Sequence, residues 1–357
     1  MTTVAAAPRT NDLRVRALEL LPTPAAIRTE APLDDDGAAL VASSRRGASD
    51  ILRGADDRLL VVVGPCSIHD PEAALAYAAR LAPLRERFAD SLEVVMRVYF
   101  EKPRTTLGWK GLINDPGLDG SHDVPRGLRL ARRVLLDVVA AGLPAATEFL
   151  EPTTPQYVAD AVSWGAIGAR TPESQVHRQL ASGLSMPIGF KNATDGDVQA
   201  AIDGCVAAAA EHTFLGIDDD GRASAVATTG NPDGHVVLRG GRSGPNFDAA
   251  SVAAALDLIG AAGLPRRLVV DASHGNSGKD HVRQAGVVRE LAQRIGAGER
   301  GIAGVMIESF LVPGRQEPAP TGLVFGQSVT DACVGWDETE ELLAALAVAS
   351  ASRRLSA

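Results

Sequence analysis

Short apolar runs that alternate with longer amphipathic segments constrain the fold of this chain more than any other feature. Eight runs rich in apolar residues lie at 59–63, 93–98, 145–149, 166–169, 187–191, 236–239, 268–271 and 304–308. Such runs are typical of strands buried on both faces of a parallel sheet. Segments with helical periodicity lie at 71–88, 126–141, 155–163, 174–183, 196–210, 248–262, 283–295 and 337–350. This alternation predicts an α/β fold, a (β/α)8 TIM barrel.

A doubly wound open sheet shows the same alternation and is the alternative fold. We favour the barrel because one run after another ends in a polar or charged residue. Barrel enzymes carry their active sites at the carboxyl ends of their strands. The pattern therefore predicts a functional site built from several strand ends.

Two parts of the chain lie outside this alternation. Residues 1–57 are expected to form an N-terminal arm and helix with a regulatory or assembly role, and residues 58–357 the catalytic barrel. Within the arm, 11–21 reads as a short strand or extended arm, Pro22 and Pro24 as a turn, and 34–53 as a helix. A β-hairpin is expected at about 213–229, with Asp220 and Gly221 at its turn. It is not needed to close a barrel, so we expect it to serve assembly or regulation.

Composition limits the possible partners. The net charge of the 357 residues is −9, which argues against non-specific binding to nucleic acid. The three cysteines, Cys66, Cys205 and Cys333, are far apart and odd in number, which indicates a reducing cytoplasm and no disulfide framework. The chain shows neither a signal peptide nor an apolar run near the roughly 20 residues that cross a bilayer. An anionic ligand would therefore need a local cluster of cations.

Four metal-binding residue types follow the expected strands. Cys66 follows the first strand, His274 the seventh and Glu308 the eighth, and Asp331 precedes the last helix. Each alone has a structural explanation, such as a buried thiol or the start of a helix. Because the first, seventh and eighth strands of a barrel are neighbours, the four side chains are expected to converge. Thiolate, imidazole and two carboxylates suit Mn²⁺, Fe²⁺, Co²⁺ or Zn²⁺ rather than Mg²⁺ or Ca²⁺.

Basic residues end the strands in the middle of the chain. They are Arg97, Lys102, Arg170, Lys191 and Arg239. Guanidinium and ammonium groups at successive strand ends predict a site for a phosphate plus a carboxylate, or for two phosphates. Glu148, at the end of the third strand, is placed to orient a cation or a water. A metal beside such a site suggests Lewis-acid polarisation of a carbonyl next to a phosphorylated partner. Carbon–carbon bond formation and phosphate-ester hydrolysis both fit these residues.

Several long motifs carry a family resemblance. They read GPCSIHDP, MRVYFEKPRTTLGWKGLINDP, GARTPESQVHRQLASGLSMPIGFKN, GNPDGHVVLRGG, DASHGNSGKD, VMIESF and QSVTDACVGW. From about Asp12 to the last helix, the chain resembles the type I 3-deoxy-D-arabino-heptulosonate 7-phosphate (DAHP) synthases, in their short, feedback-regulated microbial form. The resemblance implies condensation of phosphoenolpyruvate with erythrose 4-phosphate, the first step of the shikimate pathway. It also implies a homodimer or homotetramer.

The resemblance implies a role for each predicted site residue. It makes Cys66, His274, Glu308 and Asp331 the metal ligands. It makes the phosphoenolpyruvate contacts Arg97, Lys102, Arg170, Lys191 and Arg239, with the backbone near Ala169. It makes the erythrose 4-phosphate contacts Lys102, Pro103, Arg104 and Thr105. Lys102 is expected to protonate the developing alkoxide, and Glu148 falls on an active-site acid of the family. The catalytic set is therefore Lys102, Cys66, His274 and Glu148.

The resemblance also implies a site for an aromatic amino acid that inhibits the enzyme. The matching residues are Asp12, Val15, Pro152, Gln156, Ser185, Phe214, Gly216 and Val226. Pro152 and Gly216 differ from the Met and Ser expected of phenylalanine-sensitive members, which favours tyrosine as the effector. Pro172 and Ala193 are small departures that remove no functional group.

Three other functions remain alternatives at this point. A 3-deoxy-manno-octulosonate 8-phosphate synthase would use arabinose 5-phosphate, but the KPRT motif, long arm and hairpin argue against it. A non-catalytic phosphate-binding barrel would be expected to lack Lys102 or a metal ligand, and all are present. A metal-dependent aldolase acting on a pyruvate enolate is the third.

Overall fold

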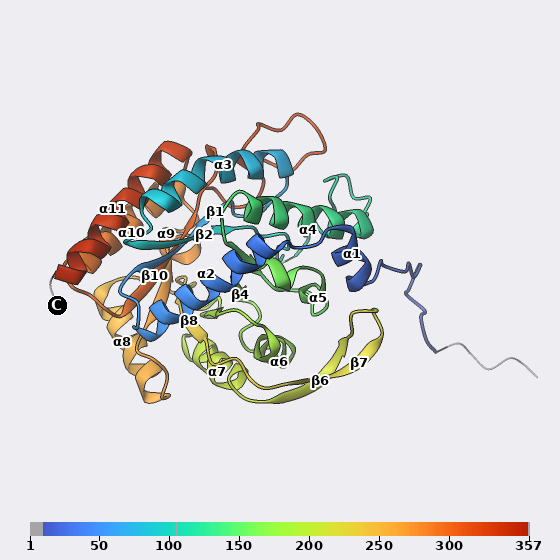
Figure 1. Cartoon of the computed structure of the whole chain (residues 1–357), viewed down its shortest axis with the longest axis horizontal. Coiled ribbons are helices and arrows are strands. Elements are labelled where there is room, and N and C mark those ends of the chain that lie inside the picture. The colour runs from blue at the N-terminus through green and yellow to red at the C-terminus, as the bar shows by residue number, and fades with distance from the viewer. Residues whose placement is uncertain (1–9, 105, 356–357) are drawn as a thin grey trace, which may run out of the picture.

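Eight parallel strands close into a barrel in the computed structural model, which describes residues 10–104 and 106–355 (Figure 1). The order around the barrel is β1-β10-β9-β8-β5-β4-β3-β2. The strands are β1 (Leu59–Gly64), β2 (Leu92–Arg97), β3 (Ala145–Glu148), β4 (Trp164–Ile167), β5 (Ile188–Lys191), β8 (Gly234–Leu238), β9 (Leu268–Asp271) and β10 (Ile302–Glu308). The predicted barrel is confirmed and the open-sheet alternative is wrong. Each predicted strand lies within two residues of an observed one.

The strands are apolar on both faces because both faces are covered. In β1, Leu60 and Val62 belong to a cluster inside the barrel, whereas Val61 and Val63 pack against the surrounding helices. The β-branched side chains suit this pleated surface. Parallel pairing aligns the strand ends, so that Gly64 of β1 lies opposite Glu308 of β10. That alignment brings the residues after each strand to one rim.

Helices surround the barrel, and one of them also closes its floor. The outer elements are α3 (Pro71–Arg87), α4 (Val124–Ala140), α5 (Pro155–Val158), α6 (Gln175–Gly183), α7 (Gln199–Ala208), α8 (Ala249–Ala261), α9 (His274–Ser277), α10 (His281–Gly296) and α11 (Trp336–Leu355). Helix α2 (Asp35–Arg53) contributes Ala48, Ile51 and Leu52 to the cluster inside the barrel. The amino end of the barrel is therefore filled, and the carboxyl end is left for a site.

The predicted helix at 155–163 is wrong in its second half. Helix α5 ends at Val158, and a 3-10 turn, Ala159–Ala161, follows it. In a continued α-helix the backbone N–H of Ser163 would donate to the Ala159 carbonyl, but it donates to Ala145 O of β3. Arg45 of α2 donates to the carbonyls of Ala159 and Val162. Pairing of the following segment with β3 thus ends this helix early.

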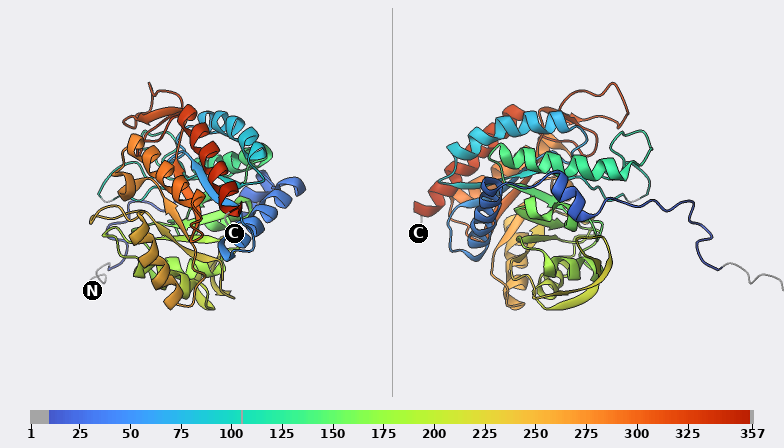
Figure 2. Two further views of the ribbon diagram at one scale, coloured as in Figure 1. Left: turned by 90° about the vertical axis from the view of Figure 1, so that its left-hand side faces the viewer. Right: turned by 45° about the vertical axis from the view of Figure 1, so that its right-hand side comes forward.

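The N-terminal region contains a helix that the sequence did not predict. The turn predicted at Pro22 and Pro24 is wrong, because Pro24 is the first residue of α1 (Pro24–Glu30) and Thr23 caps it. Proline suits the first helical position because its missing N–H is not needed there. Before α1, the described part of the arm forms no strand and stands clear of the body in the views of Figures 1 and 2.

The predicted hairpin consists of β6 (His212–Ile217) and β7 (Ala223–Thr228), which pair antiparallel outside the barrel. The Asp219 carbonyl near its tip accepts a hydrogen bond from Ala25 N, and the Asp219 carboxylate pairs with Arg28. The hairpin and α1 are thereby joined. A short unpredicted pair, β11 (Val312–Arg315) and β12 (Gln327–Ser328), follows β10. None of the helices described is both long and apolar enough for a membrane span.

Candidate active site

A cavity of about 230 Å³ opens at the carboxyl ends of the barrel strands. Ten of the predicted site residues line it: Lys102, Pro103, Arg104, Glu148, Ala169, Arg170, Lys191, Arg239, His274 and Asp331. An adjoining cavity of about 650 Å³ shares Arg104, Arg170, Arg239 and His274 and adds Arg242. The predicted Thr105 lies outside the described residues. Residues from seven different strand ends or loops thus share one surface.

Three of the four predicted metal ligands form a tight group below this cavity. Cys66, Glu308 and Asp331 each present one ligand atom within 4.8 Å of the others. His274 adjoins them, with Nε2 3.6 Å from Oε1 of Glu308. Cys66 and Glu308 are fully buried. A soft thiol beside imidazole and carboxylates matches the donor set of a transition-metal site.

The backbone around His274 is held in an uncommon conformation. His274 has a φ of 55°, in the left-handed region that few side chains adopt. The next residue, Gly275, donates its N–H to the carbonyl of Arg239, and a Cβ on Gly240 would lie 2.4 Å from Gly275. Two loops approach so closely that only glycines fit between them. Strain maintained by its surroundings is typical of functional sites.

Mutual charges tune the acidic members of this group. Burial raises the pKa of Asp331, but Lys102, His274 and Lys279 lower it to about 2. Burial likewise raises the pKa of Glu308, and His274 and Arg97 bring it below its ordinary value. Both carboxyls are therefore ionised at neutral pH. Burial, followed by the charge of Glu308, raises the pKa of the Cys66 thiol to about 11.

Arg97, the last residue of β2, lies at the bottom of the site. Its side chain is fully buried, and Nη2 lies 3.1 Å from Oε1 of Glu308. Its guanidinium carbon lies 4.0 Å from the centre of the Tyr99 ring, a favourable cation–π distance. Nη1 of Arg97 has no hydrogen-bond partner among the described residues. A buried donor without a partner is rare in proteins unless a ligand or water completes it.

The loop after β2 places a lysine against the metal-binding group. Lys102 Nζ lies 3.1 Å from the carbonyl oxygen and 3.3 Å from Sγ of Cys66. The loop is held by Lys102 N donating to Lys110 O and Arg104 Nε donating to Trp109 O. Burial lowers the pKa of Lys102, but Cys66 and Glu308 raise it above its ordinary value. Lys102 is therefore a protonated donor within reach of the group.

Glu148 and the cations beyond it complete the wall of the cavity. A Cβ on Gly168 would lie 2.0 Å from Oε1 of Glu148, so the glycine makes room for this carboxylate. Asn192 Oδ1 accepts the backbone N–H of Arg239, which fixes the strand end that carries Arg239. Burial lowers the pKa of Arg239, yet the guanidinium stays charged at neutral pH. The wall thus presents positive charge in an acidic protein.

Two residues at this site were missed from the sequence. Asp271 ends β9 and pairs with Lys191 at 2.8 Å, and Lys279 pairs with Asp331 at 3.0 Å. Burial raises the pKa of Asp271, but Lys191 and His274 lower it well below its ordinary value. Asp271 is the first residue of the DASHG motif, so the sequence does show a carboxylate at this strand end. Its role could not be predicted, because Lys191 comes from a distant segment of the chain.

A separate cavity of about 560 Å³ lies between the hairpin, α1, α2 and α5. Six of the eight predicted inhibitor residues line it: Pro152, Gln156, Ser185, Phe214, Gly216 and Val226. Asp12 and Val15 do not line it; they lie on the exposed arm. The structure therefore brings together the members from the barrel and hairpin but not those from the arm.

A buried carboxyl joins this region to the loop of the active site. Glu101, next to Lys102, accepts hydrogen bonds from Leu150 N, Glu151 N and Thr154 Oγ1. Burial raises the pKa of Glu101 to about 8. Sequence analysis did not single out this residue, because nothing local indicates that a glutamate in a basic loop turns inward.

Comparison with known proteins identifies the family. Residues 30–344 match the DAHP synthetase I family. A phospho-2-dehydro-3-deoxyheptonate aldolase of Corynebacterium glutamicum is 57% identical over 356 residues, which cover 98% of this chain and 96% of that protein. The Phe-sensitive phospho-2-dehydro-3-deoxyheptonate aldolase of Escherichia coli is 53% identical over 345 residues, which cover 96% of this chain and 98% of that protein.

A solved structure agrees with these relatives. The phospho-2-dehydro-3-deoxyheptonate aldolase from Francisella tularensis superposes with a TM-score of 0.94 at 49% identity, covering 95% of this chain and 99% of that chain. The agreement extends over nearly the whole length of both chains. The chain belongs to the DAHP synthetase I family.

Proposed function

We propose that the protein condenses phosphoenolpyruvate with D-erythrose 4-phosphate and water to give DAHP and phosphate, the first step of the shikimate pathway. The observation that carries this proposal is the cavity in which Lys102, Arg170, Lys191 and Arg239 lie beside the cysteine–carboxylate group. The family match and the names of its relatives support the same reaction.

The donor set fits a divalent metal held by Cys66, His274, Glu308 and Asp331. Three of these side chains already present converging atoms, and Nε2 of His274 lies 3.6 Å from Oε1 of Glu308. We propose Mn²⁺, Fe²⁺, Co²⁺ or Zn²⁺, because a thiolate ligand disfavours Mg²⁺ and Ca²⁺. When bound, such an ion supplies Lewis-acid polarisation of the aldehyde carbonyl.

The cations divide between the two substrates. Phosphoenolpyruvate is assigned to Arg97, Lys102, Arg170, Lys191 and Arg239, with the backbone at Ala169. Erythrose 4-phosphate is assigned to Lys102, Pro103, Arg104 and Thr105. The unpartnered Nη1 of Arg97 supports an anion at the base of the site. Holding both reactants in one orientation can supply roughly 7–11 kcal/mol of the barrier.

The side chains then carry out a balanced sequence of steps. C3 of phosphoenolpyruvate attacks the aldehyde carbon, and Lys102 donates a proton to the alkoxide that forms. Water, which Glu148 is placed to orient, adds to the cation left at C2 and gives up a proton, which balances the proton that Lys102 donated. As the bond from C2 to the phosphate oxygen breaks, the C2 hydroxyl becomes the ketone carbonyl and its proton passes to the leaving phosphate, whose charge Arg170, Lys191 and Arg239 stabilise.

A phosphate-release assay tests this function. Phosphate is expected only when phosphoenolpyruvate and erythrose 4-phosphate are both present with a divalent metal. Release with arabinose 5-phosphate instead would favour the octulosonate 8-phosphate synthase. No release with either aldehyde would favour the non-catalytic barrel, and release of phosphate without an aldehyde would indicate hydrolysis.

We further propose feedback inhibition by an aromatic amino acid bound in the cavity beside the hairpin, with tyrosine as the favoured effector. Phe214 offers an aromatic contact there, and Arg28 and Arg45 offer charge for a carboxylate. Relatives named Phe-sensitive and Trp-sensitive support regulation of this kind, whereas the preference for tyrosine depends on Pro152 and Gly216.

Initial rates with added tyrosine, phenylalanine and tryptophan test the regulation. Tyrosine is expected to inhibit most strongly, and Ser185→Phe to relieve inhibition by filling the cavity while basal activity is kept. If none of the three amino acids changes the rate, this cavity has no such role.

We propose a cytoplasmic homodimer or homotetramer. Leu13, Leu18 and Leu20 on the arm are 66%, 87% and 97% exposed, and exposed apolar clusters are typical of contact surfaces. The three free cysteines fit a reducing compartment. Light scattering is expected to give two or four copies, and a monomer at micromolar concentration would contradict the assembly.

A further inference from the structure

Asp271 lies between the proposed metal ligands and the cations, and it was assigned to neither group. Its side chain is fully buried. Oδ2 lies 2.8 Å from Nζ of Lys191 and 2.9 Å from Nδ1 of His274. A single carboxylate oxygen therefore contacts a proposed phosphoenolpyruvate lysine and a proposed metal ligand.

The position of this carboxylate is fixed from several sides. Oδ1 accepts the backbone N–H of Ser273 at 3.0 Å. The backbone carbonyl of Asp271 accepts from Asn276 Nδ2 at 2.8 Å, and the next N–H, of Ala272, donates to Met306 O of β10. Because the carboxylate has little freedom to turn, its two partners share one oxygen in a fixed place.

The negative charge of Asp271 stabilises the buried cations around it. Lys191 is 3% exposed, and a buried ammonium without a counterion would be strongly destabilising. Asp271 is also close enough to Arg97 and Arg239 to affect their ionisation. One anion thus lets several cations gather before a substrate arrives.

Sharing an oxygen has a consequence for binding. An ion on the far nitrogen of His274 would polarise its Nδ1–H and strengthen the hydrogen bond to Oδ2 of Asp271. Less of the charge of that oxygen would then neutralise Lys191, and more of the positive field of Lys191 would act on a phosphate. A phosphate bound to Lys191 would likewise weaken the attraction between Lys191 and Asp271. The carboxylate of Asp271 would then bind the Nδ1–H of His274 more strongly and make the imidazole a better metal ligand. Both effects have the same sign, as reciprocal coupling requires.

We propose that Asp271 is a positioning residue that couples the two sites, so that divalent metal and phosphoenolpyruvate each strengthen the binding of the other. This inference rests on the proposed function, because it takes its two ligands from there. It adds a residue and a thermodynamic link that the family assignment does not supply.

The test measures binding rather than turnover. Mn²⁺ affinity is measured by electron paramagnetic resonance without and with phosphoenolpyruvate, for the unchanged chain, Asp271→Asn and a control, Asp280→Asn. Asp280 caps α10 at the surface nearby, and asparagine also caps helices well. In the unchanged chain, phosphoenolpyruvate is expected to tighten Mn²⁺ binding about 5- to 150-fold.

Asp271→Asn is expected to weaken Mn²⁺ binding about 10- to 100-fold and to bring the tightening by phosphoenolpyruvate close to onefold. Asp280→Asn should leave both values unchanged. Asp271→Glu, which keeps the charge but moves the oxygen, is expected to lose most of the tightening as well. A purely structural role would lower the unfolding temperature or weaken both ligands while the tightening factor persisted, and that result overturns the inference.

Failure of the proposed function would look different. If the unchanged chain bound Mn²⁺ and phosphoenolpyruvate with coupling but released no phosphate with erythrose 4-phosphate, the reaction would be wrong and the coupling would stand. If it turned over normally and Asp271→Asn retained the coupling, the reaction would stand and the role of Asp271 would be wrong.

Discussion

Basic and titratable side chains are buried at both ends of the barrel, but they meet different partners there. At the carboxyl end, Arg97, Lys191 and His274 face carboxylates, and the latter two also line a cavity of about 230 Å³. At the amino end, the corresponding hollow holds only about 20 Å³. Both ends belong to the same strands and carry similar residue types. The difference between them therefore arises from the loops that follow or precede the strands.

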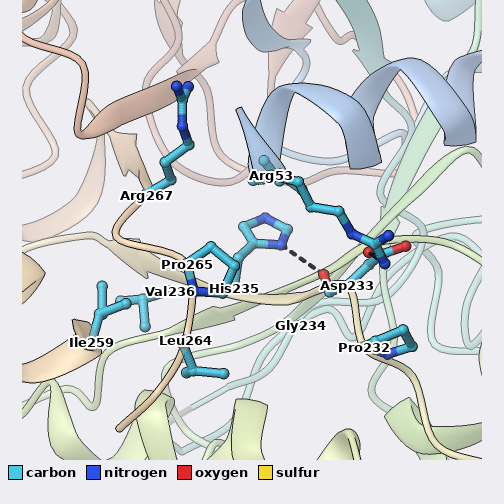
Figure 3. A pocket seen from close by; sticks show the side chains of 11 residues that line it. Arg53, Pro232, Asp233, Gly234, His235, Val236, Ile259, Leu264, Pro265 and Arg267 are labelled. Atoms are coloured by element: carbon cyan, nitrogen blue, oxygen red, sulfur yellow. Dashed lines mark hydrogen bonds and ion pairs between the residues drawn. The ribbon is translucent and has the colours of Figure 1, made fainter. Parts of the chain in front are cut away.

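At the amino end, the buried side chains of His235 and Arg353 are satisfied by the protein itself. His235 Nε2 accepts a hydrogen bond from Trp164, and Nδ1 lies 3.1 Å from the Asp233 carbonyl (Figure 3). Arg353 donates to the carbonyls of Ile302 and Asp57. Burial, with Arg267 and Arg300 nearby, lowers the pKa of Arg353 to about 10. These donors are occupied by backbone carbonyls and contribute to stability.

At the carboxyl end, a buried donor remains available to bind a ligand. Nη1 of Arg97 has no hydrogen-bond partner within the described ranges. The comparison teaches that a buried cation indicates function when its donors remain open beside a cavity, and stability when carbonyls consume them. Four changes test that distinction.

Cys66→Ala, at the carboxyl end, is expected to have the largest effect on activity. Loss of the thiolate removes a proposed metal ligand and several kcal/mol of transition-state stabilisation, about a thousandfold or more in kcat. Phosphate release and Mn²⁺ binding measure the loss. Cys205→Ala is the matched control, because Cys205 is also buried but lies on α7. Normal turnover by Cys66→Ala stripped of metal would refute the role of this thiol.

Arg353→Met, at the amino end, is expected to lower stability and leave turnover per folded molecule unchanged. It leaves buried carbonyls without a donor, which costs about 2–4 kcal/mol of unfolding free energy. Urea unfolding and kcat measure the two effects separately. The more exposed neighbour Arg354→Met should lose about 1 kcal/mol or less. A fall in kcat without loss of stability would break the proposed division between the two ends.

His235 is expected to make the amino end sensitive to acid. Burial lowers the pKa of His235 from 6.5 to about 4, so its folded form stays neutral while the unfolded form takes a proton. Its contribution is present above pH 6.5 and is lost as pH falls towards 4, about 2 kcal/mol between pH 7 and 4.5.

The pH dependence of the unfolding free energy measures this effect. His235→Gln is expected to show a shallower decline over the same interval, whatever its stability at neutral pH. Equal slopes for the variant and the unchanged chain would show that His235 is not the group that titrates.

Arg53→Ala is expected to have the smallest effect. Arg53 pairs with Asp233 at the rim of the small hollow, and about half of its side chain is exposed (Figure 3). Exposed pairs contribute about 0–1 kcal/mol, and less at high salt. Thermal unfolding at low and high salt measures it. A loss above about 2 kcal/mol would mean that the floor depends on this pair.

Elements whose structure depends on their own residues were predicted correctly, whereas elements that depend on contacts with distant segments were not. The β1 run predicted its strand because a stretch of Leu and Val has few alternatives to a doubly covered strand. The helix at 155–163 was overestimated because the backbone N–H of Ser163 donates to Ala145 O of the neighbouring strand β3 and not to the Ala159 carbonyl. Helix α1 was missed because Pro24 reads as a turn until its position as the first helical residue is known.

The sequence alone determined which segments form the barrel strands and which side chains follow each strand. Apolar runs of this length bury both faces, and parallel strands must present their following residues on one rim. The sharing of Asp271 by Lys191 and His274, the inward turn of Glu101 and the open donor of Arg97 were decided only by the tertiary structure. These contacts join segments from different strands, and their distances depend on barrel closure, which no local pattern encodes.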